Sequence, residues 1–110
     1  MTEDRADSLA KNEALYRRVN ERIESISDTI PRDERTMDFV CECDRPGCFE
    51  KVTATRAEYE SVRAVSTHFI VHHGHLDPRV EHVAHKTDRF TVVEKEGEAA
   101  RTAEAEDPRT

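Results

Sequence analysis

The sequence predicts a small α+β domain that follows an N-terminal amphipathic helix. Three observations support this fold class: a helical spacing of apolar residues before Pro31, strand-like and helix-like periods together between residues 36 and 95, and three closely spaced cysteines. Only 35% of the 110 residues are hydrophobic, whereas 37% are charged. The apolar core is therefore expected to be small, and something besides burial is needed to hold the fold together.

Residues 1–35 are predicted to form a helix and a charged linker. Apolar side chains recur every three or four positions from about Asp7 to Asp28, with Asn12 interrupting the stripe, and Pro31 ends the helix. The stripe suits a short coiled-coil seam, in which a buried Asn fixes the register, or it packs on the domain that follows. The predicted partner-binding residues are Leu9, Tyr16, Val19, Ile23 and Ile26.

Residues 36–95 are predicted to form the compact α+β domain, and its first half is a hairpin followed by a helix. Alternating apolar and polar side chains predict a strand over residues 37–41 and a returning strand over residues 49–53, with Asp-Arg-Pro-Gly as the turn between them. Thr55 and Glu58 then have the spacing of a capping box, which begins a helix that extends to about Ser66.

The second half of the domain contains two more predicted strands, over residues 68–71 and 90–93. Between them, Asp77-Pro78 is expected to begin a short helical turn that runs through Val83. From Glu96 onward the chain consists of small and charged residues without an apolar anchor, so residues 96–110 are predicted to be a disordered acidic tail.

The three cysteines, Cys41, Cys43 and Cys48, lie within eight residues of one another and predict a zinc site. An odd number of cysteines in a reducing compartment does not indicate a disulfide framework, whereas thiolates are ligands that zinc prefers. Zinc takes four tetrahedral ligands, and histidine is the usual complement to three cysteines. His75 is the predicted fourth ligand because Gly74 allows a tight turn before it. His72 and His73 are the nearest alternatives.

Other interpretations of the same residues remain open. The cysteines can be free buried thiols, a thiol-based redox site, or ligands of a two-iron cluster, although Cys48 is too near and His75 too far along the chain for the usual spacing of that cluster. His82 and His85 have an i, i+3 spacing that can bind metal on a helix, and they are expected to be ordinary surface histidines.

Charge and motif content disfavour several function classes. Every third of the chain is net negative, within a total of −7, so nucleic acid is a disfavoured partner. The first 30 residues contain no apolar run, which predicts a cytoplasmic protein without a signal peptide or a membrane span. No H-E-x-x-H or P-C-x-x-C motif occurs, and a closed four-ligand site leaves no position for a reactive water. The protein is therefore not expected to be an enzyme.

The chain also resembles a family of small, mostly uncharacterised bacterial proteins that bind zinc through a C-x-C-x4-C … G-H signature. The resemblance covers nearly the whole chain, and its residues are Asn12–Ile23, Phe39–Cys43, Cys48, Glu58–Ala64, Gly74-His75 and Val92–Lys95. The family pattern has Pro-Gly-His-Glu where this chain has His73-Gly74-His75-Leu76, which implies that His75 is the ligand. The family brings no established activity.

Two function classes follow from these residues. The first is a regulatory or adaptor module, in which zinc fixes a binding surface and the N-terminal helix contacts a protein partner or a second copy of the chain. The second is a sensor of zinc or oxidants, in which the thiolates are oxidised and release the metal. A metal-dependent hydrolase that uses His82 or His85 is a weaker third class.

Overall fold

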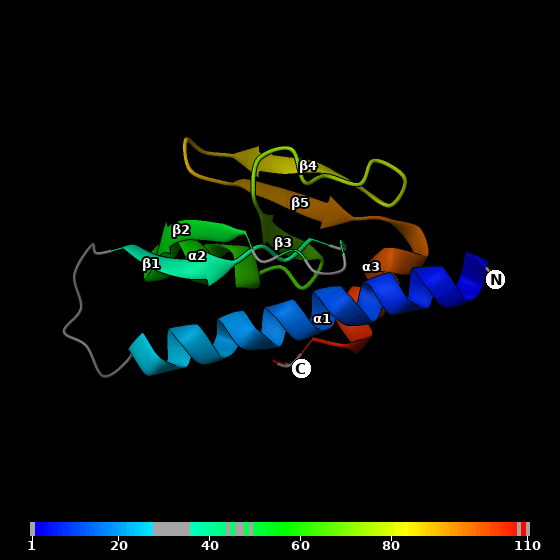
Figure 1. The fold of residues 1–110 in the computed structure, drawn as a ribbon, viewed down its shortest axis with the longest axis horizontal. Helices are drawn as coiled ribbons and strands as arrows, with labels where there is room; N and C mark the ends of the chain where they lie inside the picture. Colours follow the sequence, from blue (N-terminus) through cyan, green and yellow to red (C-terminus); the bar gives the residue numbers. More distant parts are fainter. Residues whose placement is uncertain are drawn as a thin grey trace.

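The structure describes residues 2–27, 36–43, 45, 48, 50–107 and 109, with side chains in the first helix described from Glu13 to Ser25. Over these residues a computed structural model shows the predicted α+β class, with three helices and two antiparallel sheets (Figure 1). The elements in chain order are α1 (Thr2–Ser27), β1 (Thr36–Val40), β2 (Lys51–Thr55), α2 (Arg56–Arg63), β3 (His68–Val71), β4 (Glu81–Lys86), β5 (Thr91–Lys95) and α3 (Gly97–Ala105). Pro31 and the expected linker lie outside the described residues.

The strands form two small sheets that meet beside the first two cysteines. β1 and β2 make a hairpin whose register runs from Thr36 opposite Thr55 to Val40 opposite Lys51. The second sheet has the order β3-β5-β4, and all of its pairings are antiparallel. The amide of Glu42 donates to the carbonyl of Ile70 at 2.8 Å. This bond joins the chain leaving β1 to β3, so the hairpin and the second sheet are fastened together.

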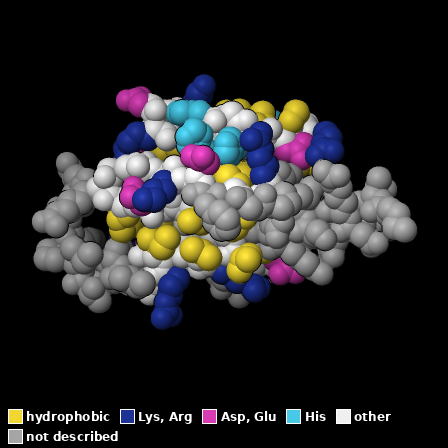
Figure 2. All heavy atoms as spheres, in the orientation of Figure 1, with side chains coloured by type: hydrophobic (Ala, Val, Ile, Leu, Met, Phe, Trp, Pro, Cys, Tyr) yellow, Lys and Arg dark blue, Asp and Glu magenta, His cyan; other side chains and the backbone are white. Residues whose placement is uncertain are grey.

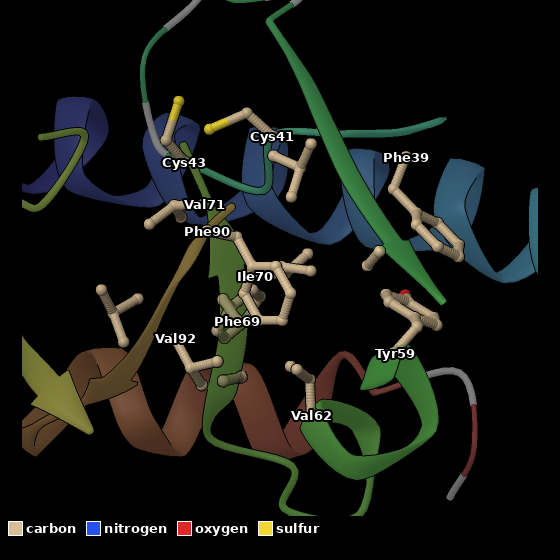
Figure 3. Close-up of a cluster of buried hydrophobic side chains, with 14 residues drawn as sticks. Phe39, Cys41, Cys43, Tyr59, Val62, Phe69, Ile70, Val71, Phe90 and Val92 are labelled. Atoms are coloured by element: carbon tan, nitrogen blue, oxygen red, sulfur yellow. The ribbon is translucent and has the colours of Figure 1, made fainter. Parts of the chain in front are cut away.

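The apolar core lies between the hairpin, α2 and the second sheet (Figure 3). Phe39 and Tyr59 stack within it, with ring centroids 4.4 Å apart and an interplanar angle of 15°. Cys41 and Cys43 are buried at the edge of the same cluster, with their sulfur atoms next to each other in Figure 3. The cysteine loop is therefore built directly onto the core.

Helix α1 is attached to the domain mainly by polar side chains. The guanidinium group of Arg17 lies over the ring of Phe69, 3.7 Å from its centroid, and donates to the carbonyl of His68. The amide side chain of Asn20 bonds both backbone groups of Val40: it donates to the carbonyl at 2.8 Å and accepts from the N–H at 2.7 Å. Asn20 thus acts as a strand neighbour of β1, which fixes the position of the helix along the hairpin.

The C-terminal segment folds where the sequence predicts a disordered tail. Residues 97–105 form α3, and Ala103 is buried. The carboxylate of Asp107 accepts from Arg63 in a buried ion pair, and Arg109 pairs with three glutamates of α1 and α2. The sequence lacks an apolar anchor here, and the structure supplies buried charge pairs instead.

Four other predictions can be compared with the structure. The capping box of Thr55 and Glu58 is confirmed at the start of α2, and the strand predicted over residues 68–71 is confirmed as β3. The returning strand of the hairpin is shifted, because β2 begins at Lys51. The turn expected at Asp77-Pro78 is present, because the amides of Val80 and Glu81 both donate to the carbonyl of Asp77 at 3.1 Å. Its predicted extension through Val83 is wrong, since β4 begins at Glu81. β4 pairs only with β5, and all of its residues after the first are exposed, so no apolar alternation marks it as a strand.

Candidate metal centre

The structure brings together the four side chains that the sequence predicts as ligands. Cys41 and Cys43 follow β1, Cys48 precedes β2, and His75 lies in the loop after β3. One ligand atom from each of the four lies within 4.8 Å of all the others. Cys41 and Cys43 are 0% and 1% exposed, whereas Cys48 and His75 are half-buried. The cluster is therefore rooted in the core and opens toward solvent on one side.

The distances within the cluster fit a single tetrahedral ion. Nδ1 of His75 lies 3.4 Å from Sγ of Cys41 and 3.6 Å from Sγ of Cys48. Zinc–sulfur and zinc–nitrogen bonds of about 2.3 and 2.0–2.1 Å, set at tetrahedral angles, place these atoms about 3.6 Å apart. The side chains already stand at the separation that such an ion requires.

Each of the three sulfur atoms also accepts a hydrogen bond from a backbone N–H group. His72 N donates to Cys41 Sγ at 3.2 Å, Arg45 N donates to Cys43, and Glu50 N donates to Cys48. All three bonds lower the pKa of the thiol that accepts them. A donor on each sulfur stabilises the thiolate form, which is the form that binds metal.

The thiols also affect one another. The hydrogen bond between Cys41 and Cys43 raises the pKa of Cys41 and lowers the pKa of Cys43 to about 4, and burial raises the pKa of Cys41 and of Cys48. Neighbouring negative charges oppose the ionisation of all three groups together. A divalent cation at the centre removes that opposition, so the electrostatics of the cluster favour a bound metal ion.

The position of His75 depends on the turn that precedes it. Gly74 has a φ of 85°, in the left-handed region that favours glycine, and the amide of His75 donates to the carbonyl of His72 at 3.0 Å. The guanidinium group of Arg45 donates to the carbonyl of Gly74 at 3.3 Å. This bond ties the loop that carries the histidine to the loop that carries the cysteines.

The cysteine segment is held from the core side by Glu42. Its side chain is 0% exposed and accepts from Asn20 Nδ2 at 2.9 Å, Tyr59 Oη at 2.9 Å and the amide of Ile70 at 3.0 Å. Burial raises the pKa of this carboxyl group, and Arg17 opposes that shift. Sequence reasoning missed Glu42, because a charged residue between two cysteines carries no local signal of burial, and its partners lie on α1, α2 and β3.

The other histidines have different surroundings. His73 bonds the hydroxyl group of Thr91 at 2.8 Å and the carbonyl of Asp88 at 3.1 Å. Nδ1 of His72 lies 3.1 Å from the carbonyl of His73, and the ring is 5.1 Å from that of His75. Neither ring belongs to the four-atom cluster, and His82 and His85 are exposed on β4.

The predicted partner-binding residues of α1 do not share one environment. Tyr16 is buried and Ile23 packs partly buried against the core, whereas Val19 is 39% exposed. The side chains of Leu9 and Ile26 lie outside the described part of the helix. Part of the apolar stripe therefore packs on the chain's own domain, and part of it faces solvent.

Comparison with known proteins found no match: no family model, curated protein or solved structure matches the chain. Within the described residues, no helix combines the length and apolarity that a bilayer span needs. Conclusions about function therefore depend on the residues of the site.

Proposed function

We propose that the protein binds one zinc ion through Cys41, Cys43, Cys48 and His75, and that this ion is the structural centre of a non-enzymatic protein-interaction domain. The observation that carries the proposal is the convergence of four ligand atoms within 4.8 Å of one another. Three soft thiolates and one imidazole suit zinc. A two-iron cluster would instead hold its ligands in two pairs on opposite sides of the cluster, and such a separation does not suit this compact set.

A structural role follows from the number of ligands. Four protein ligands complete a tetrahedral site and leave no coordination position for a reactive water molecule. The two most buried sulfur atoms form part of the core surface, so a bound ion joins the hairpin to the loop after β3. In a chain with so few hydrophobic residues, a structural zinc ion can contribute roughly 10–16 kcal/mol of apparent folding free energy.

The interaction role is supported by what α1 leaves exposed. Leu15 and Val19, one helical turn apart, are 54% and 39% exposed. Three of the described basic side chains are already engaged by acidic groups: Arg17 and Arg63 are buried in ion pairs, and Arg89 pairs with Glu58. A protein partner therefore suits this surface better than nucleic acid. Micromolar binding of mixed duplex and single-stranded nucleic acid, weakening steeply with salt, would contradict this assignment.

A sensor of zinc or oxidants is the second candidate function, and the exposure of Cys48 favours it. Cys48 is half-buried, whereas the other two sulfur atoms are shielded. An oxidant can therefore reach one thiolate without unfolding the core. Release of zinc by dilute hydrogen peroxide in minutes, followed by recovery on reduction, would favour the sensor, while zinc retained under the same treatment favours the structural role.

Elemental analysis tests the metal assignment. After dialysis against a weak chelator, the colourless protein is expected to retain one zinc ion per chain. Cys48→Ser removes a ligand and is expected to release the zinc and unfold the cysteine loop. His73→Ala is the matched control, because it removes a neighbouring ring outside the cluster and should leave the zinc content unchanged. A visible absorption band with iron and sulfide, or a well-folded, metal-free Cys48→Ser variant, would contradict the proposal.

A further inference from the structure

The second sheet carries metal-ligating side chains on a surface separate from the cysteine cluster. His68 of β3 lies opposite Glu94 of β5, and Glu94 lies opposite His82 of β4. Residues in register across neighbouring strands project from the same face of a sheet, so the three side chains form a row across it. Histidine side chains also gather on the face of the molecule seen in Figure 2, where in Figure 1 the loop after β3 crosses in front of β4.

Both imidazoles of this row face the same carboxylate oxygen. Oε1 of Glu94 lies 3.6 Å from Nε2 of His68 and 3.5 Å from Nε2 of His82. Metal–nitrogen and metal–oxygen bonds of about 2.0–2.2 Å at tetrahedral angles separate such ligand atoms by about 3.4 Å. The distance from the carboxylate oxygen to each imidazole nitrogen is therefore close to the distance between two ligand atoms that share one metal ion.

A second and independent observation concerns the other nitrogen of His82. Its Nδ1 lies 2.5 Å from Oε2 of Glu96, which follows β5. A carboxylate bonded to one ring nitrogen holds the proton there and leaves a lone pair on the opposite nitrogen. Ligating histidines commonly have such a carboxylate partner, which orients the ring and strengthens it as a ligand. Nε2 of His82, the atom that faces Glu94, is thus prepared to bind a cation.

We propose that His68, Glu94 and His82 form a second, exchangeable site for a divalent transition metal ion such as zinc, nickel or copper, with Glu96 as a positioning residue. Two imidazoles and a carboxylate suit these ions, and three protein ligands leave a coordination position open to solvent. Only the cysteine cluster, among the described residues, has all its ligand atoms within 4.8 Å of one another. The two imidazoles must therefore turn toward each other on binding, and their side chains, 22% and 51% exposed, have room to do so.

Titration of the isotope-labelled full chain with Ni²⁺, followed by amide NMR, tests the site directly, because paramagnetic broadening reports where the ion binds. Signals of residues near His68, His82 and Glu94 are expected to broaden at micromolar Ni²⁺. His82→Ala should weaken binding more than tenfold, and Glu96→Gln by about 10- to 100-fold, the usual effect of losing a partner of a ligating histidine.

His85→Ala is the matched control, since it removes an exposed histidine from the same strand and should leave the Ni²⁺ affinity unchanged. An unchanged amide spectrum and zinc content establish that each variant is folded. The proposal is overturned if broadening is confined to the cysteine loop, if His85→Ala weakens binding as much as His82→Ala, or if Glu96→Gln binds as tightly as the parent chain. Since the spectrum locates the ion, these results leave the zinc proposal for the cysteine cluster standing.

Discussion

Glu42 provides the sharpest test of how the metal loop is held, because it stands between two ligands yet points into the core. The substitution Glu42→Ala removes the acceptor of three hydrogen bonds, from Asn20, Tyr59 and the amide of Ile70. All three donors lie inside the protein, where water does not replace the lost partner. The perturbation therefore leaves unsatisfied groups on α1, α2 and β3 at once.

The expected magnitude follows from those three donors. Each unsatisfied buried group costs about 1–3 kcal/mol, and loss of the costly buried carboxyl group offsets part of the sum. We expect a net loss of about 3–5 kcal/mol, the range found when one partner of a buried charged contact is removed. Glu42→Gln keeps one oxygen and the shape of the side chain, so it should cost about 1–3 kcal/mol.

Urea denaturation with saturating zinc measures these differences, followed by fluorescence of the tyrosines or by circular dichroism. Glu50→Ala is the control, because this exposed glutamate lies beyond the last cysteine and its substitution leaves the backbone bonds to Cys41 and Cys48 in place. The control should lie within about 0.5 kcal/mol of the parent chain. A Glu42→Ala variant as stable as the control would refute the reasoning.

The remaining predictions concern the metal, the pH dependence and α1. A strong chelator should remove zinc and abolish cooperative thermal unfolding of residues 36–95, and readdition of zinc should restore it; unfolding that is the same with and without chelator would contradict a structural ion. The pKa of Glu24 is raised to about 8, chiefly by burial, so the stability contributed by its protonated form is present below the ordinary value of 4.5 and is lost as the pH rises through about 8. Glu24→Gln should therefore reduce the fall in unfolding free energy between about pH 5 and 8. If the variant shows the same fall as the parent chain, Glu24 is not the group responsible. Glu60, whose pKa is lowered to about 2, affects stability only in more acidic solution. Ile23→Asp should lower the melting temperature because Ile23 packs against the core, whereas Val19→Asp should leave it unchanged. If the outer face of α1 self-associates, Val19→Asp should also lower the sedimentation mass, and an equal loss of stability in both variants would contradict the orientation of the helix.

Much of the fold could be predicted from local patterns in the sequence. The capping box at Thr55 and the strand at residues 68–71 follow from local chemistry, and both occur as expected. β4 could not be read in the same way, because an edge strand with exposed side chains needs no apolar alternation. α3 was missed because its anchor is a set of ion pairs between residues more than 40 positions apart, such as Arg63 with Asp107. No local pattern reports such a pairing.

The metal cluster could be predicted because its chemistry is concentrated in the sequence. Three cysteines within a short loop restrict the possible functions strongly, and Gly74 marks the turn that presents His75. The contacts that support the cluster could not be predicted in this way, since Asn20 and Tyr59 come from two helices distant in sequence. The row of His68, Glu94 and His82 likewise arises from the register between strands. Because β4 was not predicted as a strand, this register could not be predicted either.

The same contacts connect the metal loop to helix α1. Asn20 bonds the backbone of Val40 and the side chain of Glu42, the residues on either side of Cys41. Any displacement of this ligand segment therefore breaks the hydrogen bonds that Asn20 makes with Val40 and Glu42. Arg17, beside it, is held by directional contacts to the second sheet and to Asp107. Because directional contacts are lost together once their geometry changes, the order of the metal loop and the docking of α1 depend on each other.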